Sequence, residues 1–322
     1  SNKLKKNHAV HKILKKLGAE LPDHFVKTND KWVKSGKEII KKGKTTLPTG
    51  NKTNLVSKHY VCTDCHNTVI EDPDLTSPSP EKRLKYAMKN DLPFLQGTTL
   101  YGVVNRESWF NDDYVKKYGK MARKANDDLK KAIQLCAREC SQGRKLTKNE
   151  MKAILHYLNT ISLKIADLNL NKREMKKINS ALNKQNADQK TVELIKSKYL
   201  KKSPANFIEP MNKEKRKYGK KGDQQKGKFI YENSCLHCHA PGKSTRFELD
   251  NSQLTFRFLE KKLHKNSKYN LYKVIRKGTQ PLKGYRPYMP HYTKNRMSRE
   301  QTSHLIAYIK KKVENSTIIN CF

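Results

Sequence analysis

Two short stretches of the chain place cysteine and histidine at a spacing that suits covalent haem attachment. The stretches C-T-D-C-H and C-L-H-C-H hold Cys62, Cys65, His66, Cys235, Cys238 and His239. Both fit C-x-x-C-H, the attachment pattern of c-type haem. Two thiols three residues apart on a helical turn reach the two vinyl groups at one porphyrin edge, and the next histidine binds the iron. We therefore expect two covalently bound haem c groups, with His66 and His239 as axial iron ligands.

Zinc is the alternative metal that such cysteine pairs could bind. A structural zinc site takes four ligands, which come from neighbouring pairs. Here the two pairs lie far apart in the sequence, and each already carries its own histidine. The pattern therefore favours two separate haem sites.

The sequence around the second motif predicts the helices that would enclose its haem. We expect a first helix that runs into the haem turn over 223–239 and a middle helix over 270–278, which Gly278 ends. A last helix is expected over 297–313, with Ser298 as its N-cap and apolar residues at helical spacing. This order of elements predicts one compact haem domain.

A proline-bounded loop before the last of these helices holds Met289. We predict that the thioether of Met289 is the second axial ligand of this haem. A thioether favours ferrous iron and would raise the reduction potential. His291 and Met297 are close enough in sequence to compete for this role, and Met289 could instead pack in the core.

The first motif lies in a longer version of the same pattern. We expect a first helix over 31–43 and a last helix over 146–165, which Thr147 and Glu150 begin with a capping box. An insertion over 97–119, rich in aromatic residues and asparagine, separates the motif from the last helix. The first haem domain is therefore predicted to be larger than the second.

Two further thiols, Cys136 and Cys140, lie shortly before the last helix of the first domain. A gapless alignment of the two last helices places Arg138 opposite Met289, and the two cysteines flank it. One of them could supply a thiolate ligand, which would lower the potential of the first haem. The alternatives are a disulfide between them, free thiols, or a pair with Cys321.

If these two thiols are bridged, the first haem needs another sixth ligand or has an open position. The candidate side chains are His59, Met88, Met121, Met151 and His156, with His8 and His11 as remote ones. An open position would favour small-molecule chemistry.

The net charge of the chain is +39, from 69 Lys and Arg against 30 Asp and Glu. So positive a field attracts anionic partners, such as acidic proteins, anionic membranes or anionic substrates. Nucleic acid is not expected, because no recognisable binding module accompanies the charge. A hydrophobic content of 35% predicts small cores with long solvated stretches around them.

The compartment follows from the haem motifs. Covalent haem c is attached outside the cytoplasm, so we expect a periplasmic or otherwise extracytoplasmic protein. The chain begins S-N-K-L-K-K without an apolar segment, so we expect that a signal peptide has already been removed. No apolar run has the length of a transmembrane helix, although peripheral membrane association stays open.

The predicted fold class is mainly α, with two class I cytochrome c-like haem domains joined by a charged, partly helical linker. The predicted parts are a basic N-terminal arm (1–30), the first haem domain (31–170), the linker (171–221), the second haem domain (222–316) and a tail (317–322). The arm and the linker are expected to be solvated spacers or basic docking surfaces.

The residues quoted for the second domain resemble a class I cytochrome c domain. The run from G-K-E-I-I-K-K-G through C-T-D-C-H to the last helix of the first domain resembles diheme cytochromes related to thiosulfate dehydrogenase and to the diheme subunit of the thiosulfate-oxidising system. In thiosulfate dehydrogenases the catalytic haem has His and Cys ligands, but residues 67–135 here contain no Cys. In the related families the cysteine aligned with Cys136 is structural, which favours a disulfide.

These sequence patterns are compatible with three functions. The first is an exported diheme carrier that passes electrons from haem 1 to haem 2 and docks acidic redox proteins. The second is a haem oxidoreductase acting on an anionic sulfur compound such as thiosulfate, so whether the chain is an enzyme is uncertain. The third is an electron-transfer subunit of a larger redox complex. Candidate anion-binding groups for the second are Arg106, Arg123, Arg138 and Arg144.

Overall fold

The computed structural model describes residues 4–184, 186–212, 221–265, 267–279 and 288–319. It is 52% helical, and the described residues contain no β-strand, which confirms the mainly α, cytochrome c-like fold. Within these ranges, no helix combines the length and the apolar character that a bilayer crossing requires. Cys321 lies outside the described residues, as do parts of the predicted linker and tail.

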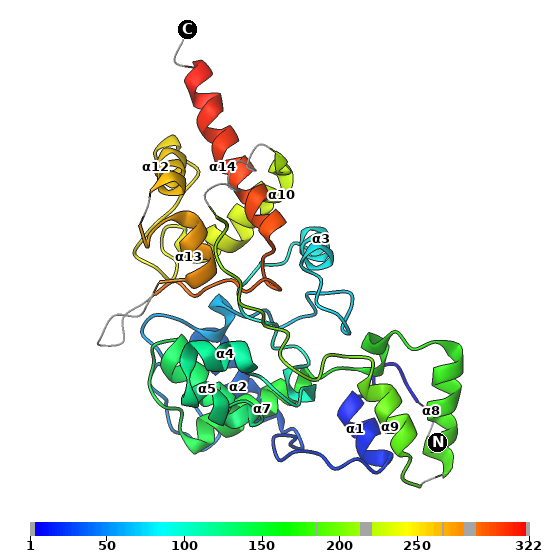
Figure 1. The fold of residues 1–322 in the computed structure, drawn as a ribbon. Helices are drawn as coiled ribbons and strands as arrows, with labels where there is room; N and C mark the ends of the chain where they lie inside the picture. The colour runs from blue at the N-terminus through cyan, green and yellow to red at the C-terminus, as the bar shows by residue number, and fades with distance from the viewer. Residues whose placement is uncertain (1–3, 185, 213–220, 266, 280–287, 320–322) are drawn as a thin grey trace.

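The first predicted domain is built on the crossing of α2 (Asp30–Lys42) and α7 (Lys148–Thr160), which Figure 1 shows side by side. The crossing is close because Gly36 has no side chain. A Cβ atom at this position would overlap the carbonyl oxygen of Ala153 on α7. Glycine at this point therefore sets the distance between the two helices.

Shorter elements connect these two helices. They are η1 (Cys62–Asp64), α3 (Pro80–Asn90), η2 (Val103–Asn105), α4 (Asp112–Tyr118), α5 (Lys120–Lys124), α6 (Leu129–Leu135) and a π-helical turn, η3 (Cys136–Cys140). The capping box of α7 is confirmed, since Glu150 N donates to Thr147 Oγ1 at 3.2 Å and Thr147 N donates to the Glu150 carboxylate at 2.8 Å.

The second haem domain repeats the crossing with α10 (Gln224–Ile230) and α14 (Arg299–Ile319). Here a Cβ atom at Gly227 would overlap the carbonyl oxygen of His304 on α14. The remaining elements are η6 (Tyr231–Cys235), α11 (Leu236–His239), α12 (Gln253–His264) and α13 (Leu271–Lys277). Gly278 ends α13 with a φ of 64°, as the sequence predicts.

The two haem domains share a hydrophobic core instead of meeting only at their surfaces. Leu84 and Ala87 of α3, together with Phe94, belong to the same buried cluster as Tyr231 and Leu305 of the second domain. Phe94 N also donates to Asn233 O at 2.9 Å. A segment of the first domain therefore completes the core of the second.

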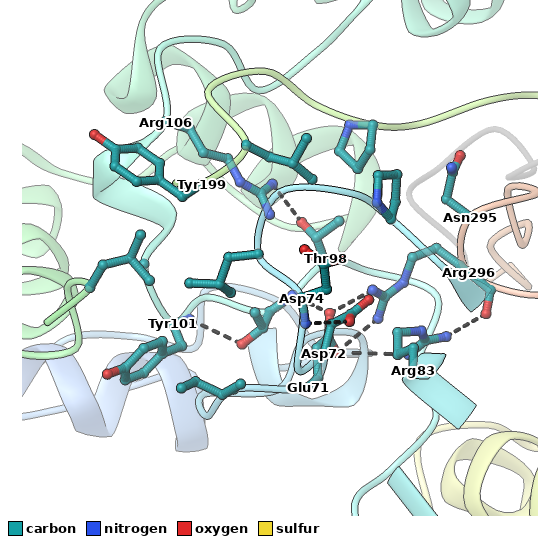
Figure 2. Close-up of a pocket in the computed structure, with 18 residues that line it drawn as sticks. Glu71, Asp72, Asp74, Arg83, Thr98, Tyr101, Arg106, Tyr199, Asn295 and Arg296 are labelled. Atoms are coloured by element: carbon teal, nitrogen blue, oxygen red, sulfur yellow. Dashed lines mark hydrogen bonds and ion pairs between the residues drawn. The ribbon is translucent and has the colours of Figure 1, made fainter. Parts of the chain in front are cut away.

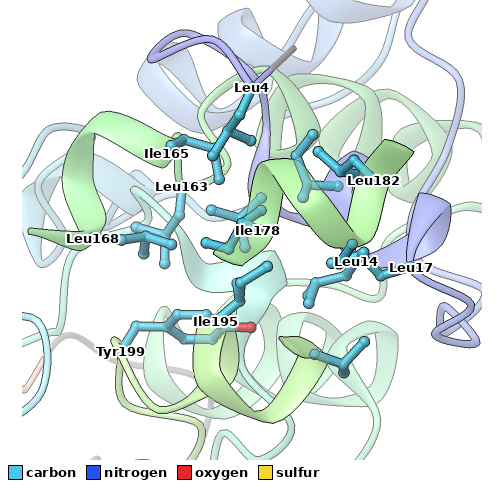
Figure 3. Close-up of a cluster of buried hydrophobic side chains, with 14 residues drawn as sticks. Leu4, Leu14, Leu17, Leu163, Ile165, Leu168, Ile178, Leu182, Ile195 and Tyr199 are labelled. Atoms are coloured by element: carbon cyan, nitrogen blue, oxygen red, sulfur yellow. The ribbon is translucent and has the colours of Figure 1, made fainter. Parts of the chain in front are cut away.

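A third packed unit is formed by the two segments expected to be spacers together with the end of the first predicted domain. It contains α1 (Val10–Lys16), η4 (Ile165–Leu168), α8 (Lys172–Lys184) and α9 (Gln189–Lys196). Figure 3 shows side chains from all these elements meeting in one cluster, among them Leu14, Ile165, Ile178, Leu182 and Ile195.

This unit corrects the expectation of solvated spacers. Ile178 and Ile195 are both 0% exposed, and the two short helices foreseen in the linker use them to pack on the N-terminal arm. The reason is amphipathic spacing: α8 buries Ile178, Ala181 and Leu182 on one face and turns its lysines outward. The basic composition of the arm and the linker gave no indication of this core, because their lysines do not occupy its buried positions.

Candidate haem sites

The second attachment motif opens into a cavity of about 440 Å³. Cys235, Cys238 and His239 form part of the wall, and Met289 and Met297 also line the cavity. The structure thus brings the predicted attachment thiols, the proximal histidine and the predicted sulfur ligand to one apolar cavity. Their donor set suits haem c, which would be attached to the two cysteines and ligated by His239 and Met289.

The imidazole of His239 is oriented by the backbone of the next loop. Its Nδ1 donates to Phe247 O at 2.7 Å, which leaves Nε2 available for iron. Such a bond to the second ring nitrogen selects the tautomer and fixes the ring orientation of a ligating histidine. Burial lowers the pKa of His239, and the bond to Phe247 opposes this, so the ring favours its neutral, ligating form.

The loop of Met289 is held close to α13. Met289 N donates to Thr279 Oγ1 at 2.8 Å, and Thr279 N donates to Met289 O at 2.9 Å. A Cβ atom at Gly278 would overlap Met289 O, so the loop passes where only glycine leaves room. Residues 280–287 lie outside the described part of the chain.

His291 and Met297, the two residues that could replace Met289 as the axial ligand, lie in different places. Met297 is 1% exposed and lines the cavity. His291 is not among the residues that line it: Lys117 Nζ donates to His291 Nδ1 at 2.8 Å, and the ring packs on Phe207. The structure therefore favours a sulfur ligand over His291 at this site.

The first attachment motif is arranged in the same way. Nδ1 of His66 donates to Thr98 O at 2.5 Å, so Nε2 is again left for iron. Burial is the main cause that lowers the pKa of His66. Gly97 passes so close to the ring that a Cβ atom there would lie 2.6 Å from His66 Nδ1. Cys62 begins η1 and Cys65 directly follows it, so both thiols precede this histidine and suit covalent attachment of a haem.

Cys136 and Cys140 occupy the π-helical turn η3, where the wider spacing of the turn brings the thiols together. Both are unbridged in the structure. A hydrogen bond with Cys136, then burial, raises the pKa of Cys140 well above the ordinary value, while the nearby His66 lowers it. The structure thus brings Cys140 to the first site, and a bridge or an iron bond both remain open.

The other sixth-ligand candidates are engaged elsewhere or lie at the surface. Met88 and Met121 are 38% and 49% exposed. His156 accepts a hydrogen bond from Asn29 N at 3.1 Å and stacks on Trp32, while Met151 packs in the core of the first domain.

The arm residue His11 stacks on Phe25, and His8 lies at the start of the third unit and accepts from Lys5 N. His59 directly precedes Tyr60, which lines the second cavity.

The two attachment motifs touch each other. Nε2 of His237 donates to Thr63 O at 3.3 Å, and Cys238 Sγ lies 3.7 Å from Asp64 O. Cys65 of the first motif also lines the cavity of the second. No signal in the sequence indicates this contact, because the motifs are far apart along the chain.

A buried cluster of charges lies around Thr98, the residue whose carbonyl oxygen orients His66, and Figure 2 shows the cluster. Arg296 of the second domain binds the carboxylate of Glu71 through two hydrogen bonds of 2.5 and 2.9 Å, and Arg83 lies 3.8 Å from the same carboxylate. Arg106 donates to Oγ1 of Thr98 at 3.1 Å, and Thr98 is also the residue that orients His66. These residues line a cavity of about 90 Å³.

Of the arginines considered for anion binding, Arg106 contacts Thr98, the residue whose carbonyl oxygen orients His66. Its guanidinium is desolvated, which lowers its pKa. Arg144 instead binds the carboxylate of Glu150 at the start of α7. The sequence pattern did not indicate Glu71 or Arg296, which are ordinary charged residues in a chain rich in charge.

Comparison with protein families matches one part of the chain. Residues 222–309 match the family described as cytochrome c oxidase, cbb3-type, subunit III. Comparisons with curated proteins and with solved structures found no match. The matched part contains the second attachment motif, its cavity and Met289, and it lies within the second predicted haem domain.

Proposed function

We propose that the chain is a diheme c-type cytochrome that carries electrons between redox partners, since residues 222–309 form a c-type cytochrome domain. Such a domain binds haem c covalently and transfers electrons. The additional elements of the proposal are a second haem at Cys62, Cys65 and His66, and electron flow from this haem to the other.

The observation that carries the proposal is the contact between the two attachment motifs. The residues that would hold the two haems meet where Cys238 Sγ lies 3.7 Å from Asp64 O. Cys65 of the first motif also lines the cavity of the second, so the two attachment sites would be neighbours. This arrangement supports direct electron transfer between haems within one chain.

The repeated architecture supports a haem in the first domain as well. Gly36 and Gly227 permit the same helix crossing, and each added Cβ would also crowd a tyrosine, Tyr157 or Tyr308. His66 and His239 each donate Nδ1 to a backbone carbonyl and leave Nε2 free. The two domains thus share the features that orient an axial histidine.

Counting the haems tests this proposal. The wild-type chain should carry two haems, measured by pyridine haemochrome absorbance against protein concentration and by intact mass. Replacing Cys62 and Cys65 by Ala, or Cys235 and Cys238 by Ala, should leave one haem each. A wild-type chain with a single haem would exclude the diheme proposal and leave the cytochrome domain of 222–309 intact.

We further propose that the protein works outside the cytoplasm, where cytochrome c domains are typically found. Acidic redox proteins or a larger redox complex would be its partners, because the net charge is +39. Peripheral attachment to an anionic membrane surface is compatible with the same charge.

An oxidoreductase acting on an anionic sulfur compound is the second candidate, and one observation favours it. The unbridged thiol of Cys140 lies near His66, and the desolvated guanidinium of Arg106 donates to Thr98, the residue that orients the same histidine. Mixing the oxidised protein with thiosulfate, and the reduced protein with tetrathionate, tests it by haem absorbance. Absence of any absorbance change with either compound would exclude this chemistry.

A further inference from the structure

The hydroxyl of Tyr60 connects the first haem domain to the loop of Met289. Tyr60 lies two residues before Cys62 and is 9% exposed. Its hydroxyl donates to Tyr288 O at 2.8 Å and accepts from Tyr288 N at 3.1 Å. One side chain from the first domain therefore satisfies both backbone groups of the residue directly before Met289.

The backbone of Met289, the next residue, is held by a residue of the second domain. Thr279 satisfies both backbone groups of Met289, through bonds of 2.8 and 2.9 Å. The four backbone groups of Tyr288 and Met289 are thus fixed by two side chains, one from each domain. Without the hydroxyl of Tyr60, the N–H and C=O groups of Tyr288 would lose both of these bonds.

The hydroxyl of Tyr60 is suited to a permanent structural bond. Burial raises the pKa of Tyr60 far above its ordinary value, and the bond to Tyr288 O only partly opposes this. The hydroxyl therefore stays protonated, so that it can donate to Tyr288 O across the physiological pH range. The ring also lines the second cavity, which places the bond at the edge of the proposed haem site.

The other end of Tyr60 is tied to the thiol turn of the first domain. Tyr60 N donates to Ser57 Oγ at 3.2 Å, and Ser57 Oγ donates to Ser141 O at 2.5 Å. Ser141 directly follows Cys140. The segments that carry the sulfur groups of the two domains are therefore linked to the same tyrosine.

We propose that Tyr60 is a positioning residue for the axial sulfur of the second haem. The inference rests on the proposed ligation of that haem by His239 and Met289. An iron–thioether bond is weak, so its strength depends on a loop that already has the ligating conformation. Hydrogen bonds that orient a metal ligand typically change its binding by about 10–100-fold.

The test is Tyr60→Phe, which removes one oxygen atom and keeps the ring. The readouts are the charge-transfer band of Met-ligated ferric haem, the alkaline pH at which this band is lost, and the potential of the second haem. A loss of about 10–100-fold in thioether binding should move that midpoint down by about one to two pH units. The potential should fall at the same time.

Tyr101→Phe is the matched control. Its hydroxyl donates to Asp167 Oδ2 at 2.8 Å, and Tyr101 does not line the cavity of the second motif. This variant should keep the midpoint of the wild type. Thr279→Val, which removes the bond to Met289 N, should shift the midpoint as Tyr60→Phe does and provides a second variant if Tyr60→Phe folds poorly.

Two results would overturn the inference in different ways. An unchanged midpoint and potential in Tyr60→Phe, with a wild-type protein that shows the Met band, would refute the role of Tyr60 alone. A wild-type protein with no such band at all would refute the ligation by Met289 and the role of Tyr60 with it. The haem count of each variant separates both results from a failure of the diheme proposal.

Discussion

Glu71 of the first haem domain and Arg296 of the second form a buried ion pair, with bonds of 2.5 and 2.9 Å and side chains 6% and 7% exposed. Arg296 also donates to Leu95 O at 2.9 and 3.1 Å. Nearly all donors of the guanidinium are thus used within the interface. This pair holds the second domain against the loop that orients His66.

Replacing Glu71 by Gln should destabilise the holoprotein strongly. Removing one partner leaves the charge of Arg296 buried without compensation, which typically costs about 3–5 kcal/mol. Chemical denaturation followed by haem absorbance and circular dichroism measures this loss. The control is Asp23→Asn, which removes an exposed pair with Lys130 at 2.6 Å and should cost about 1 kcal/mol or less. Equal losses in both variants would contradict a special role of the buried pair.

The same carboxylate should make stability depend on pH in the acidic range. Burial alone would raise the pKa of Glu71, but the charge and hydrogen bonds of Arg296, and then Arg83, lower it from 4.5 to about 2. The unfolded chain therefore binds a proton at this group that the folded chain does not. The stabilisation is complete above pH 4.5 and is lost as the pH falls towards 2.

Measuring the difference between wild type and Glu71→Gln isolates this contribution from other titrating groups. The difference in unfolding free energy should be constant above pH 5 and shrink as the pH falls below about 4. A difference that stays constant down to pH 2.5 would mean that Glu71 has an ordinary pKa in the folded state.

Cys140→Ser should alter the first haem, and Cys136→Ser should leave its ligation unchanged. The thiol of Cys140 lies close enough to His66 to affect the pKa of the imidazole, and Cys136 is the hydrogen-bond partner of Cys140. Low-temperature electron spin resonance of the ferric protein reports the axial ligands. If both variants retain the wild-type spectrum, the two cysteines form a bridge instead, which alkylation and mass measurement would detect.

Replacing Gly227 by Ala should destabilise the second haem domain by about 1–3 kcal/mol, because the new Cβ would overlap His304 O in the helix crossing. Gly36→Ala should have the same effect on the first domain through Ala153. Each variant should first weaken haem retention in its own domain. Haem absorbance, followed during denaturation, distinguishes the two domains. An effect in only one of the two would show that the crossings are not equivalent.

Electron transfer to an acidic protein acceptor should slow steeply with added salt. The charge of +39 attracts such a partner over long distances, and salt screens this attraction. Stopped-flow measurements should show a fall of about tenfold or more between low and high ionic strength. A neutral small-molecule acceptor serves as the control and should show a flat response. A flat response with the acidic protein would contradict electrostatic docking.

The chemistry of the chain could be predicted from its sequence, because each attachment motif is local. Two thiols and a histidine within one helical turn suffice for haem attachment, and the glycine and capping signals of the helices are also encoded within a few residues. The mainly α fold follows from the same local signals.

Tertiary structure alone decided how these local units meet. Tyr60 reaches Tyr288 across 228 residues of sequence, and Glu71 reaches Arg296 across 225. The arm and the linker are basic in composition, yet they share a core, because burial depends on which apolar faces meet. Contacts between distant segments have no periodic signal in the sequence, since their geometry arises only when whole helices pack. The sequence by itself therefore predicts where haem would be attached, and only packing brings the two motifs into contact.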